Sequence, residues 1–347
     1  MKKHFYTLFI AFFSFGFLNA QENQQTDSFK PHGNAFGKVF WNYHYSFDGN
    51  QKSSFEIQRA YLGYKFNFSE NISTKITIDG ARVTEASPFT VVLKHAQLDW
   101  QVATPLTLSL GLMGLTQFDT QEKFWGYRYI YKSFQDEFAL GTSADLGVNA
   151  NLQLTDWLEA DLFMLNGEGY TRLQDDFGMH KFGGDLVAEP VDGLILKAYY
   201  NLNFKKYDKY GNDSIIADTT AIQNLAFFAG YQAEKFRVGA EYNLMLNGTK
   251  YYVASEDHNL TGISVYATYL INKKFEVFGN YINFMSNTLA GQSESWNYSK
   301  DGNIIIAGMQ YVPVKGVKMA LNYRAYLYKD PDIQDDNRIY VNFEFSF

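Results

Sequence analysis

The segment Ile339-Tyr340-Val341-Asn342-Phe343-Glu344-Phe345-Ser346-Phe347 ends the chain in strict alternation of apolar and polar residues. Successive side chains of a β-strand point to opposite faces, so this segment has one apolar and one polar face. The pattern predicts a final β-strand that runs up to an aromatic residue. A soluble β-protein rarely stops on phenylalanine in the middle of a strand, so we expect an export signal at the front and many similar strands in between.

The start of the chain fits that expectation. Lys2 and Lys3 precede an apolar run from Phe5 to Leu18, and Ala20 is a small residue at a plausible cleavage position. This arrangement predicts a signal peptide over residues 1–20. The alternative, an N-terminal membrane anchor, is disfavoured because a membrane-spanning helix needs about 20 apolar residues.

Composition narrows the classes of function. Aromatic residues make up 18% of the chain, with 26 Tyr and 31 Phe, although the hydrophobic content is an ordinary 46%. Such a balance suits strands that are apolar on one side only. The absence of cysteine excludes disulfides and thiolate metal sites. Loss of Lys2 and Lys3 with the signal takes the formal net charge from −7 to −9, which argues against nucleic acid as a partner.

One repeated pattern extends from residue 21 to residue 347. After a polar lead-in to about Pro31, alternating segments of about ten residues follow one another. They predict sixteen strands, near residues 35–47, 54–68, 71–82, 90–103, 106–115, 143–154, 157–166, 180–190, 193–205, 223–233, 235–247, 260–271, 274–285, 303–313, 316–328 and 338–347.

The connections between these segments are short and long in turn. Thr104-Pro105 and Val191-Asp192 are short, whereas residues 116–142 and 206–222 are long. This alternation is typical of an up-and-down transmembrane β-barrel with tight periplasmic turns and larger outer loops. We therefore predict an all-β, antiparallel transmembrane barrel of about sixteen strands in one domain, residues 21–347. A secreted β-sandwich is the alternative, but the polar faces here are long and heavily charged.

The two faces of each strand can be assigned. In the second strand, Leu62, Tyr64 and Phe66 form an apolar face that we assign to lipid, opposite Arg59 and Lys65. A Lys or Arg facing lipid at mid-membrane costs about 2–4 kcal/mol. Apart from Lys94, for which we expect a position near an interface, the outer faces carry no charge.

The polar faces should line a water-filled channel, because about sixteen strands enclose an aqueous space. The predicted pore-lining residues are Arg59, Lys65, Lys75, Asp79, Asp99, Lys197, Arg237, Glu241 and Arg324. On the whole predicted inner face, acids slightly outnumber bases. Many of these groups would simply pair across the wall.

The connection 116–142 is too aromatic for an ordinary outer loop. It contains Phe124-Trp125-Gly126-Tyr127-Arg128-Tyr129-Ile130-Tyr131. Long ordered loops are usually functional, so we predict that it folds into the lumen and narrows the channel. The expected constriction residues are Asp119, Glu122, Lys123, Trp125, Arg128 and Lys132. A surface cap on the pore mouth is the alternative.

Several short motifs carry a family resemblance. Phe55–Tyr64, Ile72–Asp79, Ala139–Val148 and Asn166–Gly169 resemble segments of the phosphate-selective porin O and P family. The resemblance implies a sixteen-stranded trimeric porin with its third loop in the lumen. It also departs from the family, because the basic ladder that guides anions is missing from the predicted inner face. Phosphate selectivity is therefore not carried over. The terminal aromatics Phe343, Phe345 and Phe347 likewise resemble the assembly signal of outer-membrane barrels.

These observations predict a porin in the outer membrane of a Gram-negative bacterium. Ions and small hydrophilic solutes would diffuse passively through it, without a cofactor or metal. The expected partners are outer-membrane lipid, the barrel assembly machinery and two further copies in a homotrimer. One alternative is a specific channel for an anion, or for an oligosaccharide whose rings stack on Trp125, Tyr127, Tyr129 and Tyr131. An enzyme is disfavoured because His95 and the other histidines lie in no recognisable catalytic constellation, and a plugged structural barrel because no plug domain fits in the chain.

Overall fold

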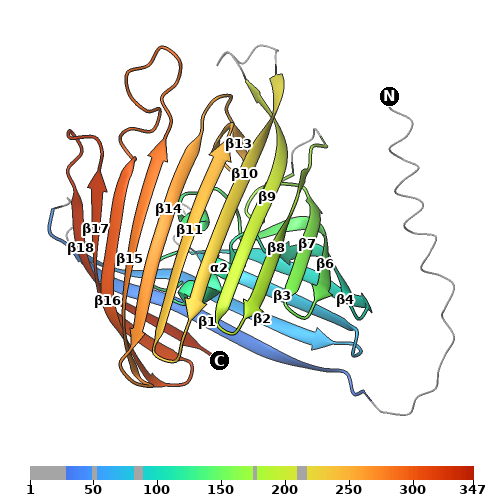
Figure 1. The fold of residues 1–347 in the computed structure, drawn as a ribbon. Coiled ribbons are helices and arrows are strands. Elements are labelled where there is room, and N and C mark those ends of the chain that lie inside the picture. Colours follow the sequence, from blue (N-terminus) through green and yellow to red (C-terminus); the bar gives the residue numbers. More distant parts are fainter. Residues whose placement is uncertain (1–28, 49–52, 82–88, 175–177, 209–216) are drawn as a thin grey trace. The chain divides into compact units, whose positions relative to one another are not determined.

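The barrel is formed by His32–Phe347. The computed structural model describes residues 29–48, 53–81, 89–174, 178–208 and 217–347, so the predicted signal peptide lies outside the described residues. The sixteen strands of the closed barrel are β1 (His32–Ser46), β2 (Ser53–Asn67), β3 (Ile72–Ala81), β4 (Thr90–Ala103), β5 (Leu106–Gly114), β6 (Ala144–Thr155), β7 (Leu158–Leu165), β8 (Lys181–Val191), β9 (Leu194–Asp208), β10 (Ala217–Gln232), β11 (Phe236–Leu246), β14 (Leu260–Leu270), β15 (Phe275–Ser286), β16 (Gly302–Val314), β17 (Val317–Tyr328) and β18 (Asp336–Ser346) (Figure 1).

Four smaller elements lie in the described connections. The connection between β5 and β6 contains two short helices, α2 (Asp119–Trp125) and α3 (Phe134–Glu137). The connection between β11 and β14 contains a hairpin of β12 (Gly248–Lys250) and β13 (Val253–Ala254). No helix of the described residues is both long enough and apolar enough to cross a membrane.

Consecutive barrel strands pair antiparallel, and β1 closes the barrel on β18. In this seam Lys38 is opposite Ser346 and Ser46 is opposite Arg338. Beyond the last strand residue, the backbone N–H groups of Gly37 and Phe347 each donate to the other's carbonyl at 3.1 Å. The Phe347 ring lies where a side chain at position 37 would stand, 2.5 Å from an ideal Cβ. Glycine at position 37 therefore lets the terminal aromatic lie across the seam.

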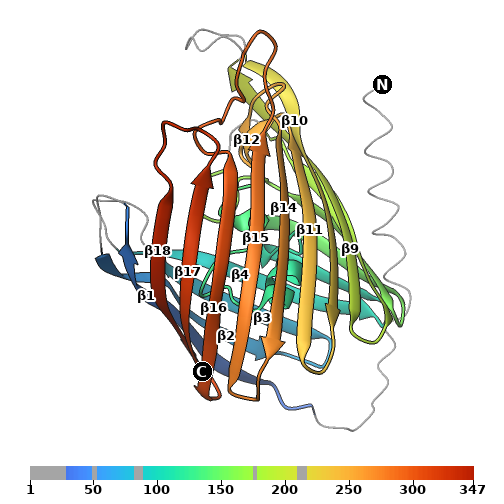
Figure 2. The ribbon, with the colours of Figure 1, turned by 60° about the vertical axis from the view of Figure 1, so that its left-hand side comes forward.

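The prediction of a sixteen-stranded barrel is confirmed, and all predicted strand limits but one lie within three residues of the observed ones. The exception is the tenth strand, predicted from residue 223, which begins at Ala217 because β9 and β10 stay paired as far as Asp208 and Ala217. Residues 217–220 are mostly polar and do not alternate, so backbone pairing alone extends the strand there. Short turns and long connections lie at opposite ends of the barrel (Figure 2).

The outward faces are apolar, as the alternation predicts. Leu62, Phe227 and Ile263 are among the large apolar side chains exposed on the barrel. The expectation for Lys94 is wrong: its ammonium lies over the rings of Tyr61 and Tyr170 in the interior. The ladder between β3 and β4 shifts register at this point, since His95 pairs with Thr77 and Leu93 with Ile78. This β-bulge turns Lys94 and His95 to the same face, which strict alternation cannot anticipate.

Candidate functional site

The connection between β5 and β6 is held by strands from widely separated parts of the wall. Its backbone carbonyls accept hydrogen bonds from Arg237 on β11, Arg324 on β17 and Asn342 on β18. Arg237 donates to the Trp125 carbonyl at 3.0 Å, and Arg324 donates to the Ile130 carbonyl at 2.7 Å. Asn342 donates to the Tyr129 carbonyl at 3.2 Å. In both ribbon views α2 is drawn between the nearer and the farther strands (Figures 1 and 2).

Two glycines of the wall receive phenylalanine rings from this connection. An ideal Cβ at Gly262 on β14 would stand 1.7 Å from the Phe134 ring, and one at Gly230 on β10 would stand 2.7 Å from Phe124. Real Cβ atoms do not approach other atoms so closely, so only glycine fits at these two positions. The close approach of ring to strand backbone fixes where α2 and α3 pack.

The aromatic residues of the connection form a buried core with the wall. Trp125, Tyr127 and Tyr129 are at most 2% exposed. Tyr127 lies 4.4 Å from Phe278 of β15, measured between ring centroids. These rings therefore cannot stack on a passing sugar, and that interpretation of Trp125, Tyr127 and Tyr129 is wrong. The sequence holds a sign of this core, because Ile304-Ile305-Ile306 in β16 is apolar on both faces.

A buried ion pair holds the first residues of the connection. Lys197 on β9 and Asp185 on β8 lie 3.4 Å apart, and both side chains are 1% exposed. Thr116 donates its hydroxyl to Asp185 Oδ2 at 2.5 Å, and the Lys197 ammonium donates to the Thr116 carbonyl. Close by, Lys181 donates to Gln117 Oε1 at 2.8 Å.

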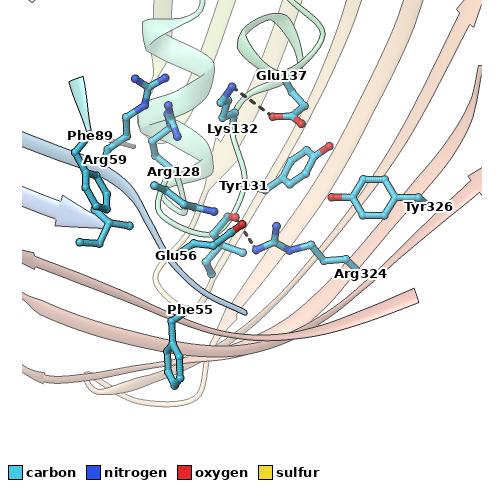
Figure 3. Close-up of a pocket in the computed structure, with 13 residues that line it drawn as sticks. Phe55, Glu56, Arg59, Phe89, Arg128, Tyr131, Lys132, Glu137, Arg324 and Tyr326 are labelled. Atoms are coloured by element: carbon cyan, nitrogen blue, oxygen red, sulfur yellow. Dashed lines mark hydrogen bonds and ion pairs between the residues drawn. The ribbon is translucent and has the colours of Figure 1, made fainter. Parts of the chain in front are cut away.

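Beside this packed half of the interior, charged side chains of the described residues line three further cavities. The first, which we call the loop-side chamber, lies toward the long connections and has a volume of about 470 Å³. Figure 3 shows Arg59 and Arg128 on one side of it, with Arg324, Tyr131 and Tyr326 on the other (Figure 3). Lys132 and Glu137, 3.7 Å apart, also line it.

The second cavity, the basic chamber, has a volume of about 680 Å³ and lies toward the short turns. Its described lining includes seven cationic side chains: Lys38, Lys65, Lys75, Lys94, Lys123, Arg128 and Lys318. Only Glu122, Asp136 and Glu344 among the described lining residues are acidic. The sequence showed no basic ladder on the inner face, and the structure gathers these cations in one chamber. Neighbouring strands β1 to β4 each supply a lysine, and Lys94 joins them through the bulge.

The third cavity, the acidic chamber, has a volume of about 410 Å³ and lies at the same end of the barrel. Its carboxylates are Asp119, Glu159, Asp161, Asp185 and Glu189, against Lys123, Lys197 and Arg237. The lysines of β1 to β4 thus line one chamber, and the carboxylates of β7 and β8 line the other.

Arg128 lines both the loop-side chamber and the basic chamber. It forms ion pairs of 3.0 Å with Glu122 and 3.1 Å with Asp136. Burial raises the pKa of the Glu122 carboxyl above its ordinary value of 4.5, although Arg128 acts in the opposite direction. These three groups lie at the boundary between the two chambers.

The other predicted residues are distributed over the interior. Lys65 and Lys75 line the basic chamber, and Asp119, Lys123, Lys197 and Arg237 the acidic one. Asp99 accepts hydrogen bonds from Gln97 at 2.7 Å and Ser109 at 2.6 Å.

Two predicted pore-lining residues do not reach a water-filled space. Asp79 is 0% exposed beneath Arg59 and Tyr170, and Glu241 is 4% exposed where α3 packs on the wall. A residue can alternate onto the inner face and still be covered by a loop. The sequence missed Tyr170 because its connection carries no regular pattern.

The terminal aromatics lie on the outside of the seam. Phe343 stacks on Trp41 of β1 with centroids 4.1 Å apart, whereas Phe345 and Phe347 are exposed. Among the described residues, no group of His, Asp or Glu side chains has the arrangement to hold a metal ion. His95 lines the basic chamber beside Lys75 and Lys94.

No protein-family model and no curated protein sequence matches the chain. Solved structures do match it. OmpF of Salmonella typhi aligns with a TM-score of 0.70 at 17% identity, over 91% of this chain and 97% of its own. The outer-membrane channel DcaP of Acinetobacter baumannii aligns with a TM-score of 0.69 at 14% identity, over 91% and 97% of the two chains. The anion-selective porin of Comamonas acidovorans aligns with a TM-score of 0.65 at 11% identity, over 92% of this chain and all of its own. At such low identity the likeness concerns the fold: this chain has the barrel architecture of these outer-membrane proteins.

Proposed function

We propose that the protein is a porin of a Gram-negative outer membrane, through which ions and small hydrophilic solutes diffuse passively. The observation that carries this proposal is a closed barrel with an apolar outside and charged chambers inside, on both sides of one loop. An apolar outer face is what a bilayer requires of a barrel, and charged walls surrounding water are what small polar solutes require of a channel.

The β5–β6 connection, in this proposal, folds into the lumen and forms the constriction. A segment bonded to β8, β9, β11, β17 and β18 of a closed barrel can meet all of them only from the inside. Its aromatic core fills the space beside β10 to β17, and the charged chambers lie toward β1 to β4 and toward β7 and β8. Arg128, with Glu122 and Asp136, would then stand at the narrowest part.

The separated charges support weak rather than strict ion selectivity. A solute at the short-turn end meets a basic wall on one side and an acidic wall on the other. Opposed walls create an electric field across the channel that orients dipolar solutes. Anions can pass along the basic wall and cations along the acidic wall. Preference for small anions is the second candidate, favoured by the seven cations of the basic chamber. Phosphate specificity is no part of this proposal, since it was not carried over from the family that the sequence resembles.

Single-channel recording in a planar bilayer tests the proposal. The purified protein is expected to open stable conductance steps, with a small reversal potential under a KCl gradient. A large reversal potential with the sign expected for a chloride current would favour the anion channel instead. Silence from protein that migrates as a folded barrel on a detergent gel would refute the porin proposal.

Glu122 should make the selectivity depend on pH. As pH falls through its raised pKa, Glu122 loses its charge while Arg128 keeps its own, so the boundary becomes more positive. We expect the reversal potential to move toward anion preference at a higher pH than an exposed glutamate would produce. The measurement is the reversal potential as pH is lowered stepwise, with Glu122→Gln as the comparison. An identical titration in that variant would assign the shift to another group.

We further propose that the protein assembles as a homotrimer with the help of the barrel assembly machinery, contacts outer-membrane lipid and has no enzymatic activity. The exposed aromatics at the seam, Phe345 and Phe347, support the assembly role. Deleting Phe347 should lower the amount of folded barrel in the membrane. The intensity of the heat-modifiable band on a detergent gel measures this amount.

The homotrimer is tested separately by chemical cross-linking in the membrane. Cross-linking should give a ladder of bands that ends at three copies, and a single band of one copy would contradict the trimer.

A further inference from the structure

The β7–β8 connection carries a tyrosine into the interior. Asn166–Gly169 follow β7 directly, and Gly167 and Gly169 have φ angles of +95° and +77°, which favour glycine. Neither position has room for a side chain: an ideal Cβ would lie 2.3 Å from Asn203 at position 167 and 2.8 Å from Tyr251 at position 169. The two turns direct the next residue, Tyr170, away from β7.

The base of this connection is fixed by strands β6 and β9. Asp145 on β6 accepts a hydrogen bond from the Gly167 N–H at 2.9 Å, and Asn203 on β9 donates to the Gly167 carbonyl at 3.1 Å. Glu168 forms an ion pair with Lys205 of β9. With its base held in this way, the chain presents Tyr170 in one place.

Tyr170 reaches β3, four strands along the wall from β7. Its hydroxyl donates to Asp79 Oδ2 at 2.8 Å, and Arg59 on β2 donates to the same oxygen at 3.0 Å. The Lys94 ammonium lies 4.7 Å from the centroid of the Tyr61 ring and 5.4 Å from that of Tyr170. Cations are attracted to the faces of aromatic rings at these distances.

The groups that share the partners of Tyr170 line different chambers. Arg59 lines the loop-side chamber, whereas Tyr61 and Lys94 line the basic chamber. Tyr170 therefore stands with Asp79 between residues that line the two cavities, and it comes from a different connection than Arg128. We propose that Tyr170 forms the second side of the constriction and sets, together with Arg128, the size of solute that passes. The inference rests on the proposed channel function.

The experiment compares Tyr170→Ala with the wild-type channel in a planar bilayer. Removing the ring should join the two chambers, so both the conductance and the size of the largest neutral polyethylene glycol that enters should rise. Tyr170→Phe keeps the ring and removes only the hydrogen bond to Asp79, so its size limit should stay near that of the wild type. Tyr298→Ala is the matched control, since Tyr298 lies in another long connection, beside Lys329.

Cysteine chemistry gives an independent readout, because the chain contains no cysteine. Tyr170→Cys should lose current when a cationic methanethiosulfonate reagent is added, and Tyr298→Cys should not. Equal conductance and equal size limit in Tyr170→Ala and the wild type, with no effect of the reagent, would overturn the inference while leaving the porin proposal intact. A silent wild-type protein would instead refute the porin proposal itself.

Discussion

Gly262→Val is expected to release the β5–β6 connection from the wall and to raise the single-channel conductance severalfold. The reason is steric, because an ideal Cβ at this position falls 1.7 Å from the Phe134 ring. Gly262 pairs with Asn243 and Phe284 on its two neighbours, so the strand cannot move away. Overpacking of this kind costs about 1–3 kcal/mol, which α3 can avoid by leaving its position.

The matched control is Gly279→Val on the next strand. There an ideal Cβ meets only the Ile306 carbonyl oxygen, at an ordinary 3.6 Å, so the conductance should not change. Adding Phe134→Ala to Gly262→Val removes the clashing ring and should bring the conductance back toward the wild-type value. If Gly262→Val folds and conducts like the wild type, the packing of Phe134 does not set the width of the channel.

The second large effect concerns stability. Asp185→Ala leaves the Lys197 ammonium buried without its carboxylate, and breaking a buried pair in this way costs about 3–5 kcal/mol. The same change removes the acceptor of Thr116, so the first residues of the connection lose an anchor. We expect unfolding in urea, followed by tryptophan fluorescence and gel migration, at a clearly lower denaturant concentration than for the wild type.

Two comparisons keep this prediction specific. Asp119→Ala breaks an exposed pair with Lys123, 2.6 Å apart, and should change stability by less than about 1 kcal/mol. The double variant Asp185→Leu with Lys197→Met removes both charges and should be more stable than Asp185→Ala. If Asp185→Ala and Asp119→Ala lose the same free energy of unfolding, the Asp185–Lys197 pair is solvated and the prediction is wrong.

Much of the barrel could be read from the sequence because its rules are local. A strand with lipid on one side and polar groups on the other must alternate, and Ile339–Phe347 shows this as clearly as any segment. The same period, interrupted by short and long polar connections, predicts the number of strands and their order. Where the pattern fades, as at residues 217–222, the predicted limit fails, because backbone pairing there needs no apolar face.

The interior could be predicted only in part, because a side chain on the inner face of the barrel does not always reach water. Lys65, Lys75 and Arg128 line chambers as expected, but Asp79 and Glu241 are covered. Their covering comes from residues far away in the chain, Tyr170 in one case and the α3 region in the other. Local periodicity carries no information about such contacts.

The sequence by itself therefore determined the closed barrel, its two faces and the unusual character of the connection 116–142. Only the tertiary structure decided which way Lys94 points, that lysines from four neighbouring strands share one chamber, and that the aromatic rings of the connection are core. The physical reason is that a two-residue period specifies a face, whereas a bulge, a register and a glycine that receives a distant ring specify a position.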